Sequence, residues 1–153
     1  MDLISTALFR DIGELIEKAK KHVAREFAFI QLLLNWHIGC RINQEVLNNE
    51  RAQYGQQVIL QLSERLTVKY GSGYDKTALS RMVKFSKLFP NSQIVATLSQ
   101  QLIWPHIIQI IAIDDPLKRE FYAEMSCVQA WDVRTLREKY KHLAIINQND
   151  NGV

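Results

Sequence analysis

Basic side chains are concentrated in the middle of this 153-residue sequence, where their spacing suits the binding of phosphate groups. Residues 51–89 carry seven basic and two acidic side chains, whereas residues 1–50 and residues 90–153 each carry six basic and seven acidic ones. The whole net charge of +3 therefore comes from one stretch of the chain. Clustered lysine and arginine neutralise the phosphates of nucleic acids, so this stretch is the candidate binding surface.

The densest part of this pattern lies between Asp75 and Phe89, where basic residues recur every three positions along one side of a predicted helix. Polar side chains near the start of such a helix can reach base edges in the major groove of DNA. We predict DNA contacts from Lys76, Thr77, Ser80, Arg81, Lys84 and Lys87, extended by Arg51, Arg65 and Lys69 if their sides of the preceding helix face the same way. The alternative is a basic helix surface that is only solvated.

Residues 56–89 have the proportions of a helix-turn-helix unit. The first helix ends at Gly71-Ser72-Gly73, because glycine adopts the backbone conformations that end helices. Asp75 is a predicted N-cap, and Tyr74 before it can pack on the helix as a hydrophobic staple. The spacing i, i+3, i+4, i+7 predicts that the second helix buries Leu79, Met82, Val83 and Ser86.

Preceding this unit, apolar residues recur at steps of three and four from Ile4 to Val46 and predict one long helix. Gly13 and Gly39 each cost about 1 kcal/mol relative to Ala in a helix, so two helices joined near a glycine are the alternative. A single helix of this length exceeds the ~30 Å diameter of a small domain, so one end must project. We expect the apolar stripe to be covered there, most simply in a homodimer.

Cap signals in the second half of the chain predict three to four further helices. The expected segments are Ser92–Leu102 with Ser92 as cap, His106–Ile113 after Pro105, Leu117–Val128 after Asp115, and Val133–Ile145 after Asp132. No sustained alternation of β-branched residues is present. The sequence therefore predicts an all-α fold with at most a minor β-hairpin, as a single domain over residues 1–146 followed by a polar tail over residues 147–153.

Side chains that could perform catalysis or bind a metal ion are scattered. The four histidines, His22, His37, His106 and His142, lack a second ligand at a metal-binding spacing, and His37 beside Trp36 suits a hydrogen-bonded core position. Nucleophile elbows, Walker loops and dinucleotide fingerprints are missing from the sequence. We therefore expect no catalytic residues, no metal site, no cofactor and no enzymatic activity of this chain alone.

The sequence contains few features that indicate a cellular compartment. Cys40 and Cys127 lie far apart and indicate reduced, mostly buried thiols rather than a disulfide framework. The sequence contains no apolar run of the ~18–20 residues needed to cross a bilayer and no secretory signal pattern at its start. We expect a cytoplasmic protein without a membrane partner.

Several segments match, in order, a known bacterial family. They are Leu33–Asn43 with Trp36-His37-Ile38-Gly39, Tyr54-Gly55, Leu62–Tyr70, Gly73-Tyr74, Leu102–His106, Asp115-Pro116, Phe121-Tyr122-Ala123, and Trp131 with Arg134 and Leu136. Residues 12–140 thereby resemble the N-terminal domain of the YhcG-like PD-(D/E)XK nuclease proteins. Pro105 departs from the family pattern, and we expect the adjacent His106 to serve packing or capping.

The resemblance implies a helical, winged-helix or helix-turn-helix-like domain that binds DNA and works with a C-terminal nuclease domain. No nuclease motif occurs in this sequence, so the resemblance implies that catalysis comes from a PD-(D/E)XK domain in trans or from the remainder of a longer protein. We expect a non-catalytic DNA-recognition module associated with such a nuclease. The alternative is a protein-interaction or dimerisation domain without direct nucleic-acid contact.

Overall fold

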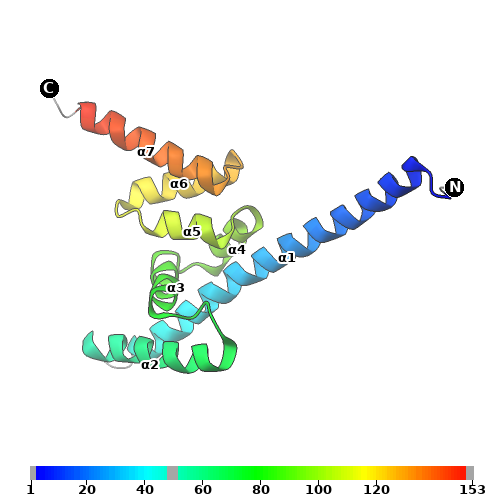
Figure 1. The fold of residues 1–153 in the computed structure, drawn as a ribbon. Helices are drawn as coiled ribbons and strands as arrows, with labels where there is room; N and C mark the ends of the chain where they lie inside the picture. The colour runs from blue at the N-terminus through cyan, green and yellow to red at the C-terminus, as the bar shows by residue number, and fades with distance from the viewer. Residues whose placement is uncertain (1–2, 48–51, 151–153) are drawn as a thin grey trace.

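The protein folds as an all-α domain in the computed structural model, which describes residues 3–47 and 52–150 (Figure 1). The helices are α1 (Thr6–Leu47), α2 (Ala52–Tyr70), α3 (Lys76–Leu88), α4 (Ser92–Gln101), α5 (Trp104–Ile111), α6 (Pro116–Val128) and α7 (Val133–Asp150). The described ranges contain no strand, so they form neither the minor hairpin nor the β-hairpin of a winged helix. The predicted all-α class is confirmed.

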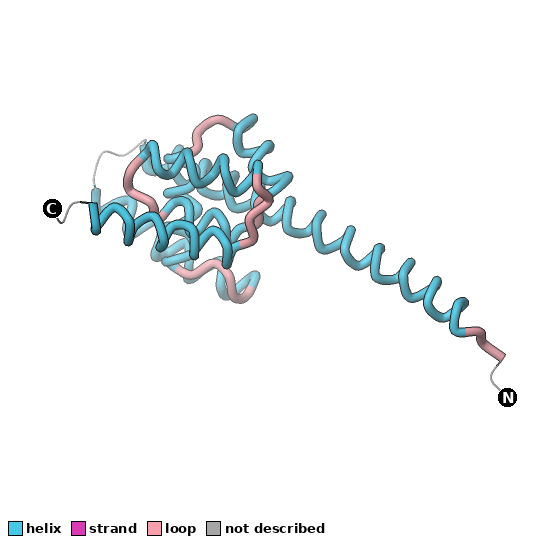
Figure 2. The backbone as a smooth tube through the Cα atoms, turned by 90° about the horizontal axis from the view of Figure 1, so that it is seen from above, coloured by secondary structure: helices cyan, strands magenta, loops and turns pink. Residues whose placement is uncertain are grey.

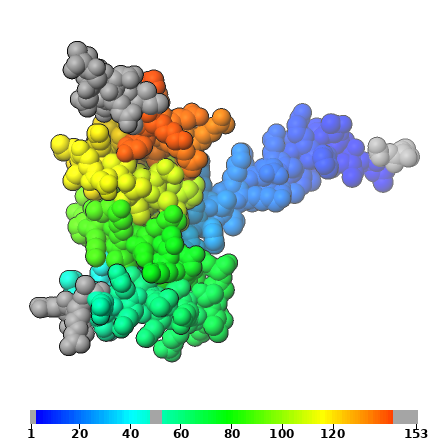
Figure 3. Space-filling view, turned by 60° about the vertical axis from the view of Figure 1, so that its left-hand side comes forward, coloured from blue at the N-terminus to red at the C-terminus, as the bar shows by residue number. Residues whose placement is uncertain are grey.

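Helix α1 is a single helix of 42 residues, as the long apolar pattern predicts. At 1.5 Å per residue it is roughly 63 Å long, and neither Gly13 nor Gly39 interrupts it. Only its second half packs against the rest of the molecule, and residues 14–27 are exposed at every position. The first half therefore projects from the helical body, as the tube and space-filling views show (Figures 2 and 3).

The body is a stack of short helices beside the second half of α1, with α2 at one end and α7 at the other (Figure 1). Its larger core cluster joins α1 and α3 to α4, α5, α6 and α7 through side chains such as Leu32, Phe85, Ile107 and Leu136. A smaller cluster around Leu79 joins α3 to α1 and α2. Helix α3 belongs to both clusters and so lies at the centre of the stack.

Three aspartates cap helices as the sequence predicts. The backbone N–H of Ala78 donates to the Asp75 carboxylate at 2.8 Å, that of Leu117 to Asp115 at 2.9 Å, and that of Thr135 to Asp132 at 2.7 Å. Each carboxylate satisfies a backbone donor that the helix leaves without a partner. The starts of α3, α6 and α7 are therefore fixed by local chemistry.

Other predicted boundaries need correction. Asn91, not Ser92, caps α4, because its amide oxygen accepts from the N–H groups of Gln93 and Ile94. Pro105 does not precede α5 but occupies its first turn, where the missing N–H has no helical partner to lose. Helix α7 runs to Asp150, five residues past the predicted end and into the segment predicted to be a tail.

His37 is also placed wrongly by the sequence. It is exposed, while its neighbour Trp36 is 8% exposed and belongs to the larger core cluster. The two rings touch edge to face, with centroids 5.1 Å apart. The core polar residue of this segment is instead Asn35, which is 2% exposed and accepts a hydrogen bond from Gln31.

Candidate nucleic-acid interface

The inner face of α3 is built as its spacing predicts. Leu79, Met82, Val83 and Ser86 are all buried, each at most 9% exposed. Phe85 is buried beside them and reaches the larger cluster, where its ring meets those of Phe89 and Trp104. Because this face is buried against α1, α2 and α5, the opposite face of α3 must point to solvent.

The outer face of α3 brings five of the predicted contact residues together. An open hollow of about 400 Å³ is lined by Lys76, Thr77, Ser80, Arg81 and Lys84. All five side chains are exposed. Three cations and two hydroxyl groups thus share one surface, which has the charge and hydrogen-bond donors that a phosphate backbone requires.

Three further predicted residues are exposed but do not line this hollow. Lys87 follows Lys84 by three positions on α3, and Arg65 and Lys69 lie on α2. The Lys69 ammonium lies 5.4 Å from the Tyr70 ring centre, and Tyr70 in turn meets Tyr74 at the entrance to α3, with ring centres 6.4 Å apart. Arg51, the last predicted extension, lies outside the described residues.

Helix α1 is the main support of α3, which sequence reasoning missed by pairing α3 with α2 alone. The indole N–H of Trp36 donates to the carbonyl of Phe89 at 2.8 Å and so holds the end of α3. The Asn43 amide donates to the Ser86 hydroxyl, which itself donates to the Val83 carbonyl at 2.7 Å. These bonds fix the rotation of α3 and therefore the direction of its basic face.

Gly39 makes this support possible. A Cβ atom built on Gly39 would lie 2.0 Å from the carbonyl oxygen of Met82, so the backbones of α1 and α3 are in direct contact there. Only glycine permits that approach. The sequence signal was the glycine itself, which interrupts an otherwise regular helical pattern.

None of the ion pairs within the described parts of the chain involves a cation of the basic face. The ion pairs found there join Arg10 to Asp11, Arg41 to Glu45, and Arg134 to Glu138, all at the surface and none with a residue of α3. Asp75 is the nearest carboxylate in sequence, and it accepts the helix-capping hydrogen bond described above. The cations of α3 therefore remain available to an external anion.

His106 has the structural role expected from its place beside Pro105. It is 5% exposed, its Nδ1 accepts from the backbone N–H of Ile103 at 3.1 Å, and its Nε2 lies 2.8 Å from the carbonyl oxygen of Trp131. Since Nδ1 accepts, the proton is on Nε2, which donates to that carbonyl. His106 thus caps α5 and ties it to the start of α7.

Shifted pKa values lie outside the basic face. Burial raises the pKa of the Cys40 and Cys127 thiols, both unpaired, which lowers their nucleophilicity at neutral pH. Burial and the nearby Tyr140 raise the pKa of Tyr122. The hydrogen bond from the Thr135 backbone lowers the pKa of Asp132, consistent with its capping role. No grouping of three potential metal-binding side chains occurs within residues 3–47 and 52–150.

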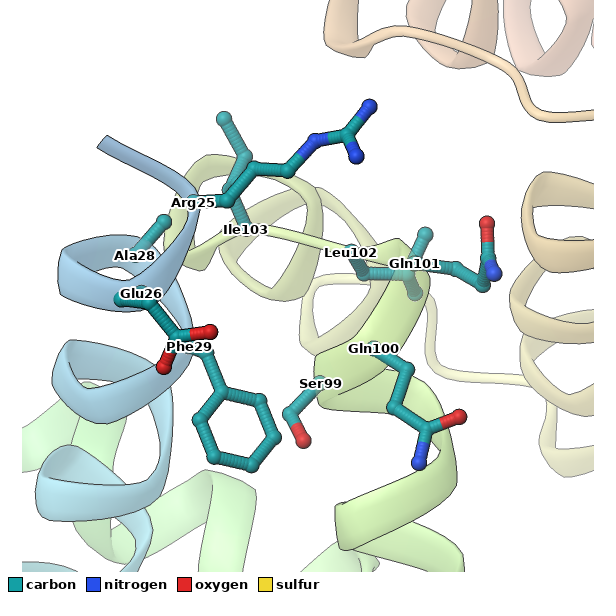
Figure 4. Close-up of a pocket in the computed structure, with 9 residues that line it drawn as sticks. All are labelled: Arg25, Glu26, Ala28, Phe29, Ser99, Gln100, Gln101, Leu102 and Ile103. Carbon is teal, nitrogen blue, oxygen red and sulfur yellow. The ribbon is translucent and has the colours of Figure 1, made fainter. Parts of the chain in front are cut away.

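A second hollow, of about 580 Å³, lies where α1 leaves the body (Figure 4). Arg25, Glu26 and Phe29 of α1 face Ser99, Gln100 and the link between α4 and α5 across it. Its lining mixes amides, one ion of each sign and an aromatic ring. No nucleophile paired with a base is present in this lining, so it carries no identifiable chemistry.

The fold and the basic outer face of α3 define a helical module whose central helix exposes a basic surface. The family model of the DUF1016 N-terminal domain matches residues 11–145, and the chain belongs to this family. No curated protein and no solved structure matches the chain at a significant level. Among the described helices, none is long and apolar enough to span a membrane.

Proposed function

We propose that this domain is a non-catalytic DNA-binding module and that α3 is the helix that contacts duplex DNA. The observation that carries the proposal is the outer face of α3, where Lys76, Arg81 and Lys84 line one open hollow with Thr77 and Ser80. An α-helix fits into the major groove, which is about 12 Å wide. The cations then neutralise phosphates on either side of the groove, and the hydroxyl groups reach phosphates or base edges near the helix start.

The contribution of the basic face to affinity depends on salt. Each neutralised phosphate of duplex DNA adds roughly 0.9 to the slope of log affinity against log salt. Arg81, Lys84 and Lys87 together would therefore contribute roughly 2.7 to that slope. Arg65 and Lys69 on α2 extend the surface if the DNA backbone passes over the turn between α2 and α3.

The test compares DNA binding by the wild type and by the triple variant Arg81→Ala/Lys84→Ala/Lys87→Ala in mobility-shift titrations at several salt concentrations. We expect the variant to bind at least about tenfold more weakly at low salt and to show a shallower slope. A matched control, Arg134→Ala/Arg137→Ala/Lys141→Ala, removes the same charge from exposed positions of α7 and should bind almost like the wild type. Equal affinity and slope for the α3 variant and the wild type would refute the proposal.

We further propose that the module works with a PD-(D/E)XK nuclease domain, either on a longer chain or on a separate protein. The support is the resemblance of residues 12–140 to the N-terminal domain of YhcG-like nucleases. If a PD-(D/E)XK protein is encoded beside this gene, the matching experiment is a cleavage assay of that protein with and without this domain. Cleavage should increase when the domain is added, and less so with the α3 triple variant.

A protein-interaction or dimerisation role is the second candidate. It is favoured by the projecting half of α1, which leaves large apolar side chains such as Leu15, Val23 and Phe27 about two-thirds exposed. This role does not require nucleic acid. It is also compatible with DNA binding, because helix-turn-helix proteins commonly bind as dimers.

A further inference from the structure

Helix α1 has two apolar faces, and the body covers only one of them. Leu32 and Trp36 are buried against the body, at 0% and 8% exposure. Leu34 lies two residues from each of them, which is a little more than half a turn around the helix, and it is 42% exposed. Its side chain therefore points away from the body, even though this part of α1 is packed.

Leu34 is the last member of an outer stripe that continues to the projecting end. The outer stripe consists of Leu8, Ile12, Leu15, Ala19, Val23, Phe27, Ile30 and Leu34. Its large members are 42–67% exposed. Its central part forms an open apolar hollow of about 510 Å³, lined by Ala19, Lys20, Val23, Ala24 and Phe27.

The opposite face of the projecting half is charged. Asp11, Glu14, Lys18, Lys21 and Arg25 recur at steps of three and four, and all are exposed. The projecting helix is therefore amphipathic, with an apolar side that nothing in the described chain covers. An amphipathic helix is stabilised chiefly by packing of its apolar face, so this face needs a partner.

We propose that the partner is a second copy of the chain, whose α1 lies antiparallel along the outer stripe. The steps between successive members of the stripe are 4, 3, 4, 4, 4, 3 and 4, which read the same in both directions. An antiparallel pair centred on residue 21 therefore matches every member of the outer stripe with another member. The facing pairs are Leu8 with Leu34, Ile12 with Ile30, Leu15 with Phe27, and Ala19 with Val23.

The size of the stripe fits a stable dimer. It extends over roughly 39 Å of helix from Leu8 to Leu34, and each of its large apolar side chains is 42–67% exposed. Monomeric proteins rarely leave contiguous apolar patches larger than a few hundred Å² uncovered. Because both copies use the same surface, the two-fold arrangement is closed and stops at two chains. This inference does not rest on DNA binding.

Light scattering with size-exclusion chromatography tests the association. We expect the wild type to have twice the 17.8 kDa mass of one chain. Val23→Glu places two carboxylates near the two-fold axis and should raise the dissociation constant at least about 100-fold. Ala7→Glu adds the same charge on the opposite face, in line with Asp11 and Glu14, and should leave the dimer intact. Both sites lie on the exposed half of α1, so circular dichroism should show unchanged folding.

Spin-label distances test the antiparallel direction. Labels are attached to Arg10→Cys or to Lys18→Cys, each in a Cys40→Ser/Cys127→Ser background. In the proposed pair the two Arg10 positions are roughly 33 Å apart along the helix axis and the two Lys18 positions roughly 9 Å, whereas a parallel pair gives equal distances.

Two results would overturn the proposal. One is a strictly monomeric wild type over the micromolar range, including a monomer that binds vesicles of anionic phospholipid through the stripe. The other is a dimer with equal distances at Arg10 and Lys18. A long distance at Arg10 with a short one at Lys18, lost in Val23→Glu and kept in Ala7→Glu, supports the antiparallel pair.

Discussion

The two halves of α1 share one continuous backbone and have opposite surroundings. In the second half, Leu32, Trp36 and Gly39 are buried and contact α3 or the core that surrounds it. In the first half, residues 14–27 have no covered position. Both halves carry apolar residues at helical spacing, so the pattern alone does not separate them. The two halves differ because the other helices pack only along the second half of α1.

The largest expected effect in this comparison is at Gly39. Gly39→Ala should lower the free energy of unfolding by about 3 kcal/mol, the upper end of the usual cost of overpacking, because the new methyl group would overlap the Met82 carbonyl and force α1 from α3. Chemical denaturation measures the change. A stability equal to or above that of the wild type would mean that α1 and α3 are not in backbone contact.

A smaller loss of the free energy of unfolding is expected from a substitution of Trp36. Trp36→Phe keeps an aromatic ring in the core but removes the indole N–H that donates to the Phe89 carbonyl, leaving that acceptor unpaired. We expect a loss of about 2 kcal/mol in the same denaturation assay. The control is His37→Ala at the adjacent exposed position, which should change stability by no more than about 0.5 kcal/mol.

The smallest effect should have the opposite sign and lies in the projecting half. A Cβ atom on Gly13 would meet nothing within 4 Å, so Gly13→Ala adds helix propensity without overlap. We expect the helix to gain about 0.5–1 kcal/mol, measured as increased protection of amides in residues 8–20 from hydrogen exchange. Decreased protection would show that this segment is not an uninterrupted helix. Substitution by alanine is therefore expected to destabilise the packed half of α1 at Gly39 and to stabilise the projecting half at Gly13.

Local features of the fold could be predicted from the sequence. The caps at Asp75, Asp115 and Asp132 depend on a side chain and a backbone group three or fewer residues apart, and the structure contains all three. Where two cap-forming residues are adjacent, as at Asn91 and Ser92, the sequence could not decide between them. The predicted start of α5 was wrong for a related reason, since proline is tolerated within the first turn of a helix as well as before it.

Non-local features could not be predicted. The apolar pattern from Ile4 to Val46 predicts one stripe, but its steps of four rotate it around the helix, from the exposed Phe27 to the buried Ile42. Two of the residues that meet the body, Asn35 and Gly39, are polar or lack a side chain, so an apolar pattern does not mark them. The burial of Gly39 depends on α3, which lies about 40 residues further along the chain.

The sequence predicts which residues form the basic face of α3. It does not predict which contacts orient that helix. The pattern that buries Leu79 and Met82 also exposes Arg81 and Lys84, because both follow from one helical period. That five of the eight candidates within the described residues share one hollow depends on their side-chain directions, which the sequence does not contain. That Trp36 and Asn43 of α1 orient the helix depends on a contact across about 40 to 50 residues.

The unbroken course of α1 also sets a length. From Leu8 to Gly39 the helix has no break, so it holds Leu8 at a fixed distance of roughly 46 Å from the point where α1 touches α3. In an antiparallel pair centred on residue 21, the two such points lie roughly 54 Å apart along the axis, about 16 base pairs of B-form DNA. Helical turns inserted into the projecting half would then change the spacing between the two basic helices while leaving each helix as it is.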